Sequence, residues 1–289
     1  MFIIFASPRS GTTLLARTLN ICDQVVIPDE TDFIIPTAFL VDRIKDPAIG
    51  RPMIKQLIWS ADQTRRSLGE YLSQADINSA VDEADYSACA IIQAIYQRLA
   101  ARAGKRVPGD KSPNDLLFLR ILVKMGLMES DIKVIHLVRD VRDVVLSLQK
   151  VDWDTGGIEH WFPRHWGHSN LYLHELMNQR PDRYRMVRYE DLVAEPERHV
   201  RDLAGFLDVP FQEKMLDHTQ RGERYAGVQD HKNISEPFLA GRAGAWRERM
   251  SDELRAACES PSREALTTFG YPRCSTQVPR ADDVSPKGA

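Results

Sequence analysis

Seven residues near the N-terminus, Ser7–Thr13 (SPRSGTT), have the composition of a loop that binds phosphate. They follow the apolar run Phe2–Ala6 and precede apolar residues at helical spacing, so we expect a strand, a loop and a helix in that order. The backbone N–H groups that begin such a helix point at a bound anion, and the helix dipole favours negative charge there. This arrangement predicts that the loop binds a phosphorylated ligand.

The loop differs from the phosphate-binding loop of ATPases and GTPases, whose pattern is GxxxxGK[ST]. Ala6 stands in place of the first glycine, Gly11 keeps the second, and Thr12 replaces the lysine. The positive charge is Arg9, which lies inside the loop. A triphosphate bound with Mg²⁺ usually needs that lysine and acidic metal ligands. The sequence therefore favours another 5′-phosphate ligand, with a P-loop nucleotide kinase or NTPase as the rival interpretation.

The string PRSGTT resembles the 5′-phosphosulfate loop of the sulfotransferases that use 3′-phosphoadenosine 5′-phosphosulfate (PAPS), in which the pattern is P-[KR]-[SA]-G-[ST]-[TS]. The residues that match it position by position are Arg9, Ser10, Gly11, Thr12 and Thr13. The resemblance implies that backbone amides of this loop hold the 5′-phosphate. It also implies that Arg9 neutralises the bridging and leaving oxygens of the donor.

A second match concerns the 3′-phosphate of the donor. The family places an Arg at the end of a later strand and a Ser eight residues on, and Arg139 and Ser147 have that spacing here. The stretch 231–249 resembles the C-terminal segment that closes over the donor. Arg242 is the candidate there for the 3′-phosphate, with Arg247 and Arg249 as competitors. Trp246, in the same stretch, is expected to pack against the protein.

Two further residues resemble catalytic groups of the tyrosylprotein sulfotransferases. Lys111, in the string GDKSP, matches a lysine near the transferring group. Glu30 lies 21 residues after Arg9 and precedes Thr31, at the position of the glutamate base in those enzymes, whereas Asp29 replaces an adjacent glutamate. A carboxylate at the carboxyl edge of a parallel sheet can take a proton from an acceptor hydroxyl.

A histidine base is the alternative. The K-x-H-L-P motif of the cytosolic small-molecule sulfotransferases is absent from the sequence. If Glu30 is not the base, the next candidates are His136, His160 and His165.

The resemblance implies in-line transfer of a sulfuryl group from PAPS to an acceptor hydroxyl, without a metal ion. The context of Glu30 favours a peptidyl tyrosine or another phenol as acceptor, followed by a carbohydrate or lipid-linked hydroxyl. The Trp- and His-rich stretch 152–166 could stack on a ring or sugar, or pack internally. A non-catalytic nucleotide-binding module is the remaining alternative.

The elements that must position these residues are strands alternating with helices. Beside Phe2–Ala6, strands are expected at Val25–Ile27, Lys133–Val138 and Tyr184–Val187. Residues 32–104 are expected to be mainly helical, with one helix over 84–103, and another helix is expected over 115–125. This alternation predicts an α/β, P-loop-like three-layer fold with a central parallel sheet flanked by helices.

Composition limits the remaining questions. The chain of 289 residues, 43% of them hydrophobic, is long enough for one large domain. The resemblance implies that this is a single sulfotransferase domain over 1–271, with 32–104 on the acceptor side, and a polar tail is expected over 272–289. A net charge of −3 argues against nucleic-acid binding. The four cysteines lack metal-ligand spacing, and no segment reaches the ~20 apolar residues of a membrane span. We therefore expect a cytoplasmic protein without stable membrane insertion. A homodimer is one assembly left open.

Overall fold

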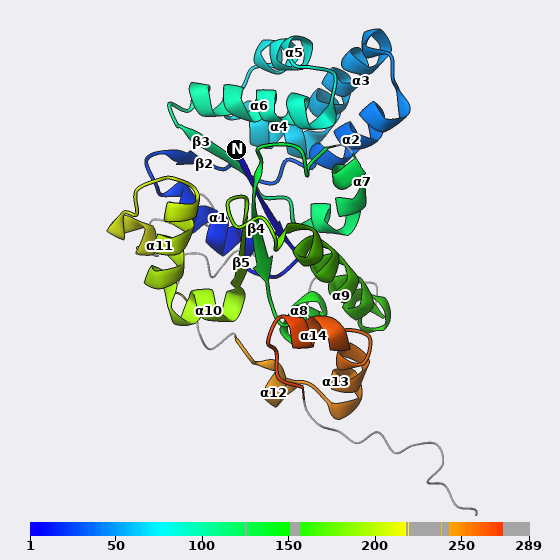
Figure 1. The fold of residues 1–289 in the computed structure, drawn as a ribbon, viewed down its shortest axis with the longest axis vertical. Helices are drawn as coiled ribbons and strands as arrows, with labels where there is room; N and C mark the ends of the chain where they lie inside the picture. Colours follow the sequence, from blue (N-terminus) through cyan, green and yellow to red (C-terminus); the bar gives the residue numbers. More distant parts are fainter. Residues whose placement is uncertain (125, 151–156, 218, 220–237, 239–242, 274–289) are drawn as a thin grey trace, which may run out of the picture.

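The computed structural model describes residues 1–124, 126–150, 157–217, 219, 238 and 243–273. Its centre is a five-stranded sheet in the order β2-β3-β1-β4-β5, in which every neighbouring pair is parallel (Figure 1). The strands are Phe2–Ala6 (β1), Val25–Val26 (β2), Val107–Asp110 (β3), Lys133–Val138 (β4) and Tyr184–Arg188 (β5). The predicted α/β class and parallel sheet are confirmed.

Helices cover both faces of the sheet (Figure 1). One face carries α1 (Thr12–Asn20), α10 (Tyr189–Ala194), α11 (Pro196–Phe206) and the short 3₁₀ helix η2 (Glu213–Leu216). The other carries α2 (Ile34–Arg43), α3 (Pro47–Ser60), α4 (Asp62–Gly69), α5 (Gln74–Glu83), α6 (Ala88–Arg102), the 3₁₀ helix η1 (Pro113–Phe118), α7 (Leu119–Lys124) and α9 (Ile158–Met177).

Alternation along β1 explains the three layers. Successive side chains of a strand point to opposite faces of the sheet. Ile3 and Phe5 enter the core under α2–α7, whereas Phe2, Ile4 and Ala6 enter the core under α1, α10 and α11. All five residues are buried, because helices cover both faces.

A third apolar core lies at the carboxyl end of the sheet. It joins α8 (Val141–Leu148) and the first half of α9 to the C-terminal helices α12 (Trp246–Arg249), α13 (Asp252–Glu259) and α14 (Arg263–Thr268). Trp166 of α9 is fully buried in this core and contacts the rings of Phe269 and Tyr271, which follow α14.

The helix boundaries differ from the prediction in two places. The helix expected from residue 84 begins at Ala88, because the Ser87 hydroxyl accepts a hydrogen bond from the Ala90 N–H and caps it (3.2 Å). The helix expected over 115–125 is divided into η1 and α7. Pro113 begins η1, and Gly126, with φ of 93°, follows the end of α7 in the conformation expected of a helix stop.

Two predictions about the whole chain can be compared with the described residues. None of the helices in the described ranges is long and apolar enough to cross a membrane. Cys22, Cys89 and Cys258 are buried free thiols. Cys274 and nearly all of the predicted tail lie outside the described residues.

Candidate active site

Two residues of the loop between β1 and α1, Arg9 and Gly11, have positive φ angles. Gly11 precedes the first residue of α1 and has φ of 92°, a conformation that L side chains rarely adopt. A Cβ added there would lie 2.5 Å from Cδ2 of Tyr189. Arg9 also has a positive φ, of 63°. Both the backbone conformation and the close approach of Tyr189 therefore require a glycine at this position.

One buried group of this loop points to a ligand. The Ser10 hydroxyl is fully buried, and no partner accepts or donates a hydrogen bond to it within the described part of the chain. A phosphate oxygen at the start of α1 would satisfy this hydroxyl together with the N–H groups of the first turn. The loop therefore fits the 5′-phosphate that its sequence predicts.

The structure brings the two predicted phosphate sites together. Nε of Arg9 donates a hydrogen bond to Oγ of Ser147 over 3.2 Å. Nη1 of Arg139 donates to the carbonyl oxygen of Arg9 over 2.8 Å, and the Arg139 guanidinium stacks 4.5 Å from the ring centre of Tyr189. Arg139 follows β4 and Ser147 lies in α8, so residues about 130 positions apart meet at the loop.

Glu30 and Lys111 form an ion pair at the same edge of the sheet. β2 and β3 are neighbours and parallel, so the residues that follow them emerge side by side. Nζ of Lys111 lies 2.6 Å from Oε1 of Glu30; the lysine side chain is 5% exposed and the glutamate 32%. Lys111 thus points inward, and Glu30 remains accessible to a second molecule.

Helix α4 fixes the backbone of Glu30. The Glu30 carbonyl oxygen accepts hydrogen bonds from Oγ of Ser67 (2.7 Å) and Nε2 of Gln63 (3.1 Å). The adjacent Asp29 faces elsewhere and pairs with Arg17 over 2.6 Å. Of the two neighbouring acidic residues, therefore, Glu30 is the one that contacts Lys111.

The three histidines that are alternative candidates for the base differ in their exposure to solvent. His136 is fully buried in β4, where its ring nitrogens bond Tyr184 (2.7 Å) and Asn170 (2.8 Å), and burial lowers its pKa to about 4. It is therefore neutral at pH 7 and out of reach of an acceptor. His160 and His165 are exposed on α9 and remain accessible.

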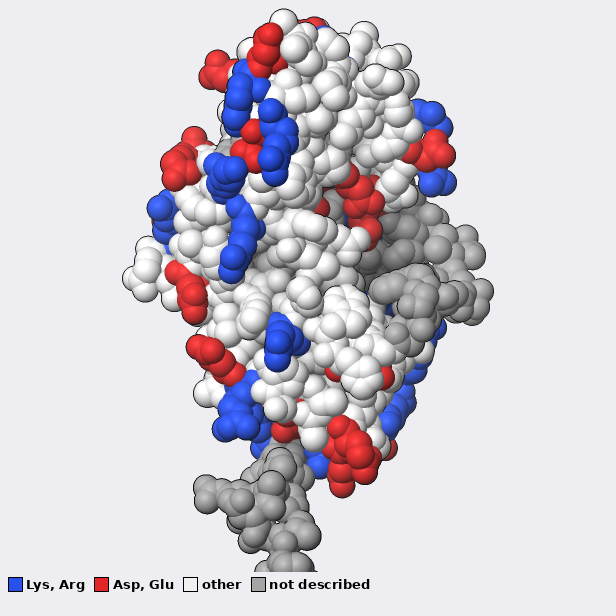
Figure 2. Space-filling model, turned by 90° about the vertical axis from the view of Figure 1, so that its right-hand side faces the viewer, with Lys and Arg blue, Asp and Glu red and all other residues white. Residues whose placement is uncertain are grey.

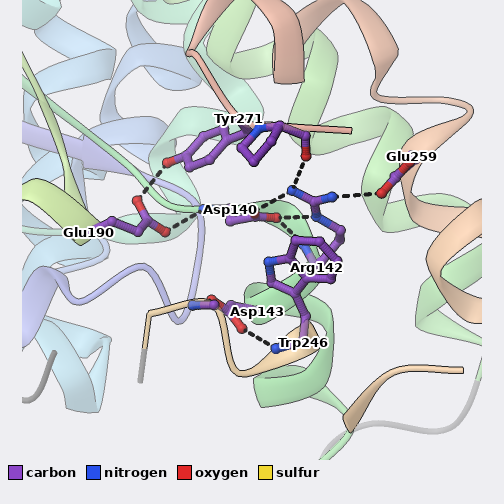
Figure 3. Close-up of polar contacts among 9 residues, drawn as sticks. Asp140, Arg142, Asp143, Glu190, Trp246, Glu259 and Tyr271 are labelled. Atoms are coloured by element: carbon purple, nitrogen blue, oxygen red, sulfur yellow. Dashed lines mark hydrogen bonds and ion pairs between the residues drawn. The ribbon is translucent and has the colours of Figure 1, made fainter. Parts of the chain in front are cut away.

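The C-terminal helices are attached to α8 by a polar network that the sequence analysis did not anticipate (Figure 3). Asp143 accepts hydrogen bonds from the backbone N–H groups of Gly244 (2.6 Å) and Trp246 (2.9 Å). The Arg142 guanidinium lies 3.5 Å from the Trp246 ring centre and pairs with Asp140 (2.7 Å) and Glu259 (2.6 Å). Trp246 is therefore held in the core, as the sequence predicted.

A second connection joins the same network to α10. Glu190 accepts from the Asp140 N–H (3.0 Å) and from the Tyr271 hydroxyl (2.9 Å). Burial raises the pKa of the Glu190 and Asp143 carboxyl groups, and hydrogen-bond donors partly offset that rise. No local sequence pattern signals this network, because its partners lie between 50 and 117 positions apart in the chain. Arg242, predicted to bind the 3′-phosphate, lies outside the described residues, two positions before Gly244.

Helix α2, which belongs to the segment 32–104 predicted to lie on the acceptor side, borders a pocket of about 520 Å³. α2, η1–α7 and α9 line it with aromatic and basic side chains, among them Phe39, Phe118, Arg120 and Tyr172. Figure 2 shows the face to which α7 and α9 contribute, with Lys and Arg spread over its upper and lower parts and interspersed with Asp and Glu. Trp161, in the Trp-rich stretch, is exposed, whereas Trp166 packs internally. The third tryptophan of that stretch, Trp153, lies outside the described residues.

Comparison with known proteins now defines the class. Residues 2–213 match the sulfotransferase family, so the chain belongs to that family. Human carbohydrate sulfotransferase 1 is 27% identical over 162 residues, which is 49% of this chain and 39% of that protein. The protein-tyrosine sulfotransferase of Drosophila melanogaster is 27% identical over 244 residues, or 79% and 42%. The chain thus spans about 40% of the length of these curated relatives.

Two solved structures match a larger share of the chain than these curated relatives do. The sulfotransferase domain of the Synechococcus PCC 7002 olefin synthase superposes with a TM-score of 0.67 at 26% identity, covering 95% of both chains. The sulfotransferase domain from the curacin biosynthetic pathway shares the fold, with a TM-score of 0.65 at 22% identity, covering 95% of this chain and 98% of that one. These likenesses extend beyond residue 213 to the C-terminal helices.

Proposed function

We propose that this protein transfers a sulfuryl group from PAPS to a hydroxyl group of an acceptor. The observation that carries the proposal is the meeting of Arg9, Arg139 and Ser147 at a loop whose Gly11 and buried Ser10 hydroxyl fit a phosphate. A 3′,5′-bisphosphorylated adenosine requires two anion sites, because it carries a phosphate at each of two positions of one ribose. Arg offers charge-assisted hydrogen bonds to each phosphate.

The donor contacts follow from these positions. The N–H groups of Ser10 to Thr13 and the Arg9 side chain hold the 5′-phosphosulfate, and Arg139 with Ser147 holds the 3′-phosphate. Arg242, which the sequence resemblance assigns to the 3′-phosphate, is the further candidate for this contact. No step uses a metal ion, because Arg9 and Lys111 carry the charge compensation.

The reaction is one in-line displacement. Glu30 takes the proton of the acceptor hydroxyl, the acceptor oxygen bonds to sulfur, and the bond from sulfur to the 5′-phosphate oxygen breaks. The leaving 3′,5′-bisphosphoadenosine (PAP) keeps the electron pair of that bond. Arg9 and Lys111 stabilise the negative charge that grows on its 5′-phosphate, so positioning and electrostatics supply most of the acceleration.

We expect PAP, but not ATP–Mg²⁺, to stabilise the protein against heat. A ligand at 100 times its Kd adds about 2.7 kcal/mol to the free energy of unfolding, which raises Tm by about 5 °C for a chain of this size. Differential scanning fluorimetry with matched nucleotide concentrations measures the shift. A larger shift with ATP–Mg²⁺ than with PAP would instead support the nucleotide kinase or NTPase.

The network around Asp143 leads to a second expected result. Asp143→Ala should weaken PAP binding about tenfold, because Gly244 and Trp246 lose their hydrogen-bond acceptor and follow the proposed donor-binding residue Arg242 closely in the sequence. Calorimetric titration with PAP gives the Kd. Asp252→Ala is the matched control, since Asp252 is exposed and pairs only locally with Arg255. Equal Kd values for the Asp143 and Asp252 variants would contradict the role.

For the acceptor we propose a peptidyl tyrosine or other phenol. The support is Glu30 followed by Thr31, together with the likeness to a protein-tyrosine sulfotransferase over 79% of the chain. A carbohydrate or lipid-linked hydroxyl is the second candidate, supported by the likeness to carbohydrate sulfotransferase 1. Transfer of ³⁵S from labelled PAPS to a panel of peptides, phenols, sugars and lipids decides between them.

The proposal also covers the cellular location and the domain organisation of the protein. A cytoplasmic location agrees with the three described cysteines, which are free thiols. The predicted division into one domain over 1–271 and a tail agrees with the olefin-synthase likeness, which covers 95% of the chain. A homodimer remains one candidate assembly.

A further inference from the structure

Asp110 is a buried carboxyl group beside the candidate catalytic lysine. It ends β3, is 0% exposed and directly precedes Lys111. Its Oδ1 accepts hydrogen bonds from the Thr31 hydroxyl over 3.0 Å, from the Tyr96 hydroxyl, and from Ser112 at 3.5 Å. Its Oδ2 is also buried, and no hydrogen-bond donor reaches it among the residues that the structure describes.

Two side-chain bonds therefore join the same two short segments. Glu30 and Thr31 follow β2, and Asp110 and Lys111 end and follow β3. Lys111 donates to Glu30, and Thr31 donates to Asp110. The first bond reaches the accessible side, where Glu30 is 32% exposed, and the second is wholly buried against Tyr96 of α6. The buried bond thus lies beneath the ion pair.

The segment that carries Glu30 depends on such bonds. β2 has only two residues, so the sheet holds little of the chain before Glu30. Asp32, two residues on, has φ of 51°, and the Thr31 carbonyl oxygen accepts a hydrogen bond from the Thr64 hydroxyl. Side chains from α4, α6 and β3 replace the ladder that a longer strand would provide.

We propose that Thr31 and Asp110 are positioning residues that set the relation between Glu30 and Lys111. The inference rests on the proposed roles of Glu30 as base and Lys111 as charge stabiliser. Neither positioning residue touches the substrates; each acts by fixing the backbone next to a group that does. A displacement of about 1 Å at a catalytic group can lower a rate about 100-fold, so a single buried hydrogen bond can control turnover.

Among the described residues, hydrogen-bond donors reach only one oxygen of the Asp110 carboxyl group, Oδ1. Burial raises the pKa of the Asp110 carboxyl group, while its hydrogen bonds and Lys111 act in the opposite direction. An asparagine keeps an oxygen at the place of Oδ1 and puts an NH₂ group at the place of Oδ2. Asp110→Asn should therefore preserve the link to Thr31, and Asp110→Ala should remove it.

The first experiment compares two threonines. Thr31→Val removes the bond to Asp110, whereas Thr37→Val makes the same chemical change at a fully buried threonine of α2 whose hydroxyl finds no partner in the described structure. We expect Thr31→Val to lower kcat at least tenfold with the Kd for PAP within twofold of wild type. Thr37→Val should keep both values. Equal kcat for the two variants would overturn the proposal.

The second experiment uses Asp110 and Glu30. Asp110→Asn should retain at least a third of the wild-type kcat, and Asp110→Ala less than a tenth, with unchanged PAP binding for both. In a Glu30→Gln background, Thr31→Val should cause no further loss. If Thr31→Val lowers kcat by the same factor in the Glu30→Gln background as in the wild type, Thr31 acts independently of Glu30. That result would overturn this inference but not the proposed sulfuryl transfer. If Glu30→Gln by itself keeps near-wild-type turnover, Glu30 is not the base. That result would overturn both the proposed mechanism and this inference.

Discussion

Replacing Glu30 by Gln is expected to lower kcat by a factor of about 10²–10⁴ while leaving PAP affinity unchanged. The amide cannot take the acceptor proton. Its oxygen can still accept a hydrogen bond from Nζ of Lys111, which lies 2.6 Å from Oε1 of Glu30 in the unsubstituted protein. The geometry of the edge between β2 and β3 is thus preserved. Initial rates with labelled PAPS and the best acceptor, together with calorimetric titration of PAP, measure the two quantities.

Asp29 provides the matched control for this prediction. It is the neighbouring carboxylate, but it pairs with Arg17 and does not contact Lys111. Asp29→Asn should keep kcat within about threefold of wild type. If Glu30→Gln kept the wild-type rate instead, the base would lie elsewhere, and the exposed His160 and His165 would be the next residues to replace, ahead of the buried His136.

The parts of the fold that the sequence predicted best are the two central strands. Phe2–Ala6 and Lys133–Val138 were predicted with the bounds that the structure shows. Strands buried on both faces form short apolar runs, and such runs stand out between polar loops. β3 has no comparable signal in the sequence, because Pro108 and Gly109 are poor strand residues. Its place between β2 and β1 is what makes it a strand.

The sequence predicted those residues of the candidate site whose spacing matches the family. It did not predict how deeply each side chain is buried, because burial depends on the packing of distant helices. Arg139 and Ser147 were expected to act at one phosphate, and the structure adds that Ser147 bonds the side chain of Arg9. Lys111 alone would have been taken for a solvated loop lysine, yet its side chain is only 5% exposed. Burial depends on the helices inserted between β2 and β3, and no local pattern specifies it.

The networks missed by the sequence analysis join residues far apart in the chain. Asp143 bonds Gly244 and Trp246 about a hundred positions later, and Thr31 bonds Asp110 about eighty positions later. A single Asp or Thr carries no sign of such a partner, since the same residues cap helices and occur in turns. Only the juxtaposition of strands and helices identifies them.

Replacing Arg139 by Leu is expected to weaken PAP binding about 100-fold. Hydrogen bonds to a charged group contribute about 1.5–3 kcal/mol, and 3 kcal/mol corresponds to somewhat more than 100-fold in Kd. Arg139 also donates to the Arg9 carbonyl oxygen, which stabilises the loop in its positive-φ conformation. The variant should therefore lose a 3′-phosphate contact directly and part of the 5′-phosphate site indirectly.

Adenosine 5′-monophosphate, which lacks the 3′-phosphate, separates these two effects. If Arg139 binds the 3′-phosphate, the Kd ratio between this nucleotide and PAP is large in the wild type and falls at least tenfold in Arg139→Leu. If Arg139 only supports the loop, both Kd values rise by the same factor and the ratio is unchanged, which would contradict the assignment. Arg185→Leu, at a β5 arginine that pairs with Asp202 across 3.3 Å, should leave both affinities at the wild-type level. The ratio therefore tests whether the arginine at the end of β4 recognises the phosphate that distinguishes PAPS from other 5′-nucleotides.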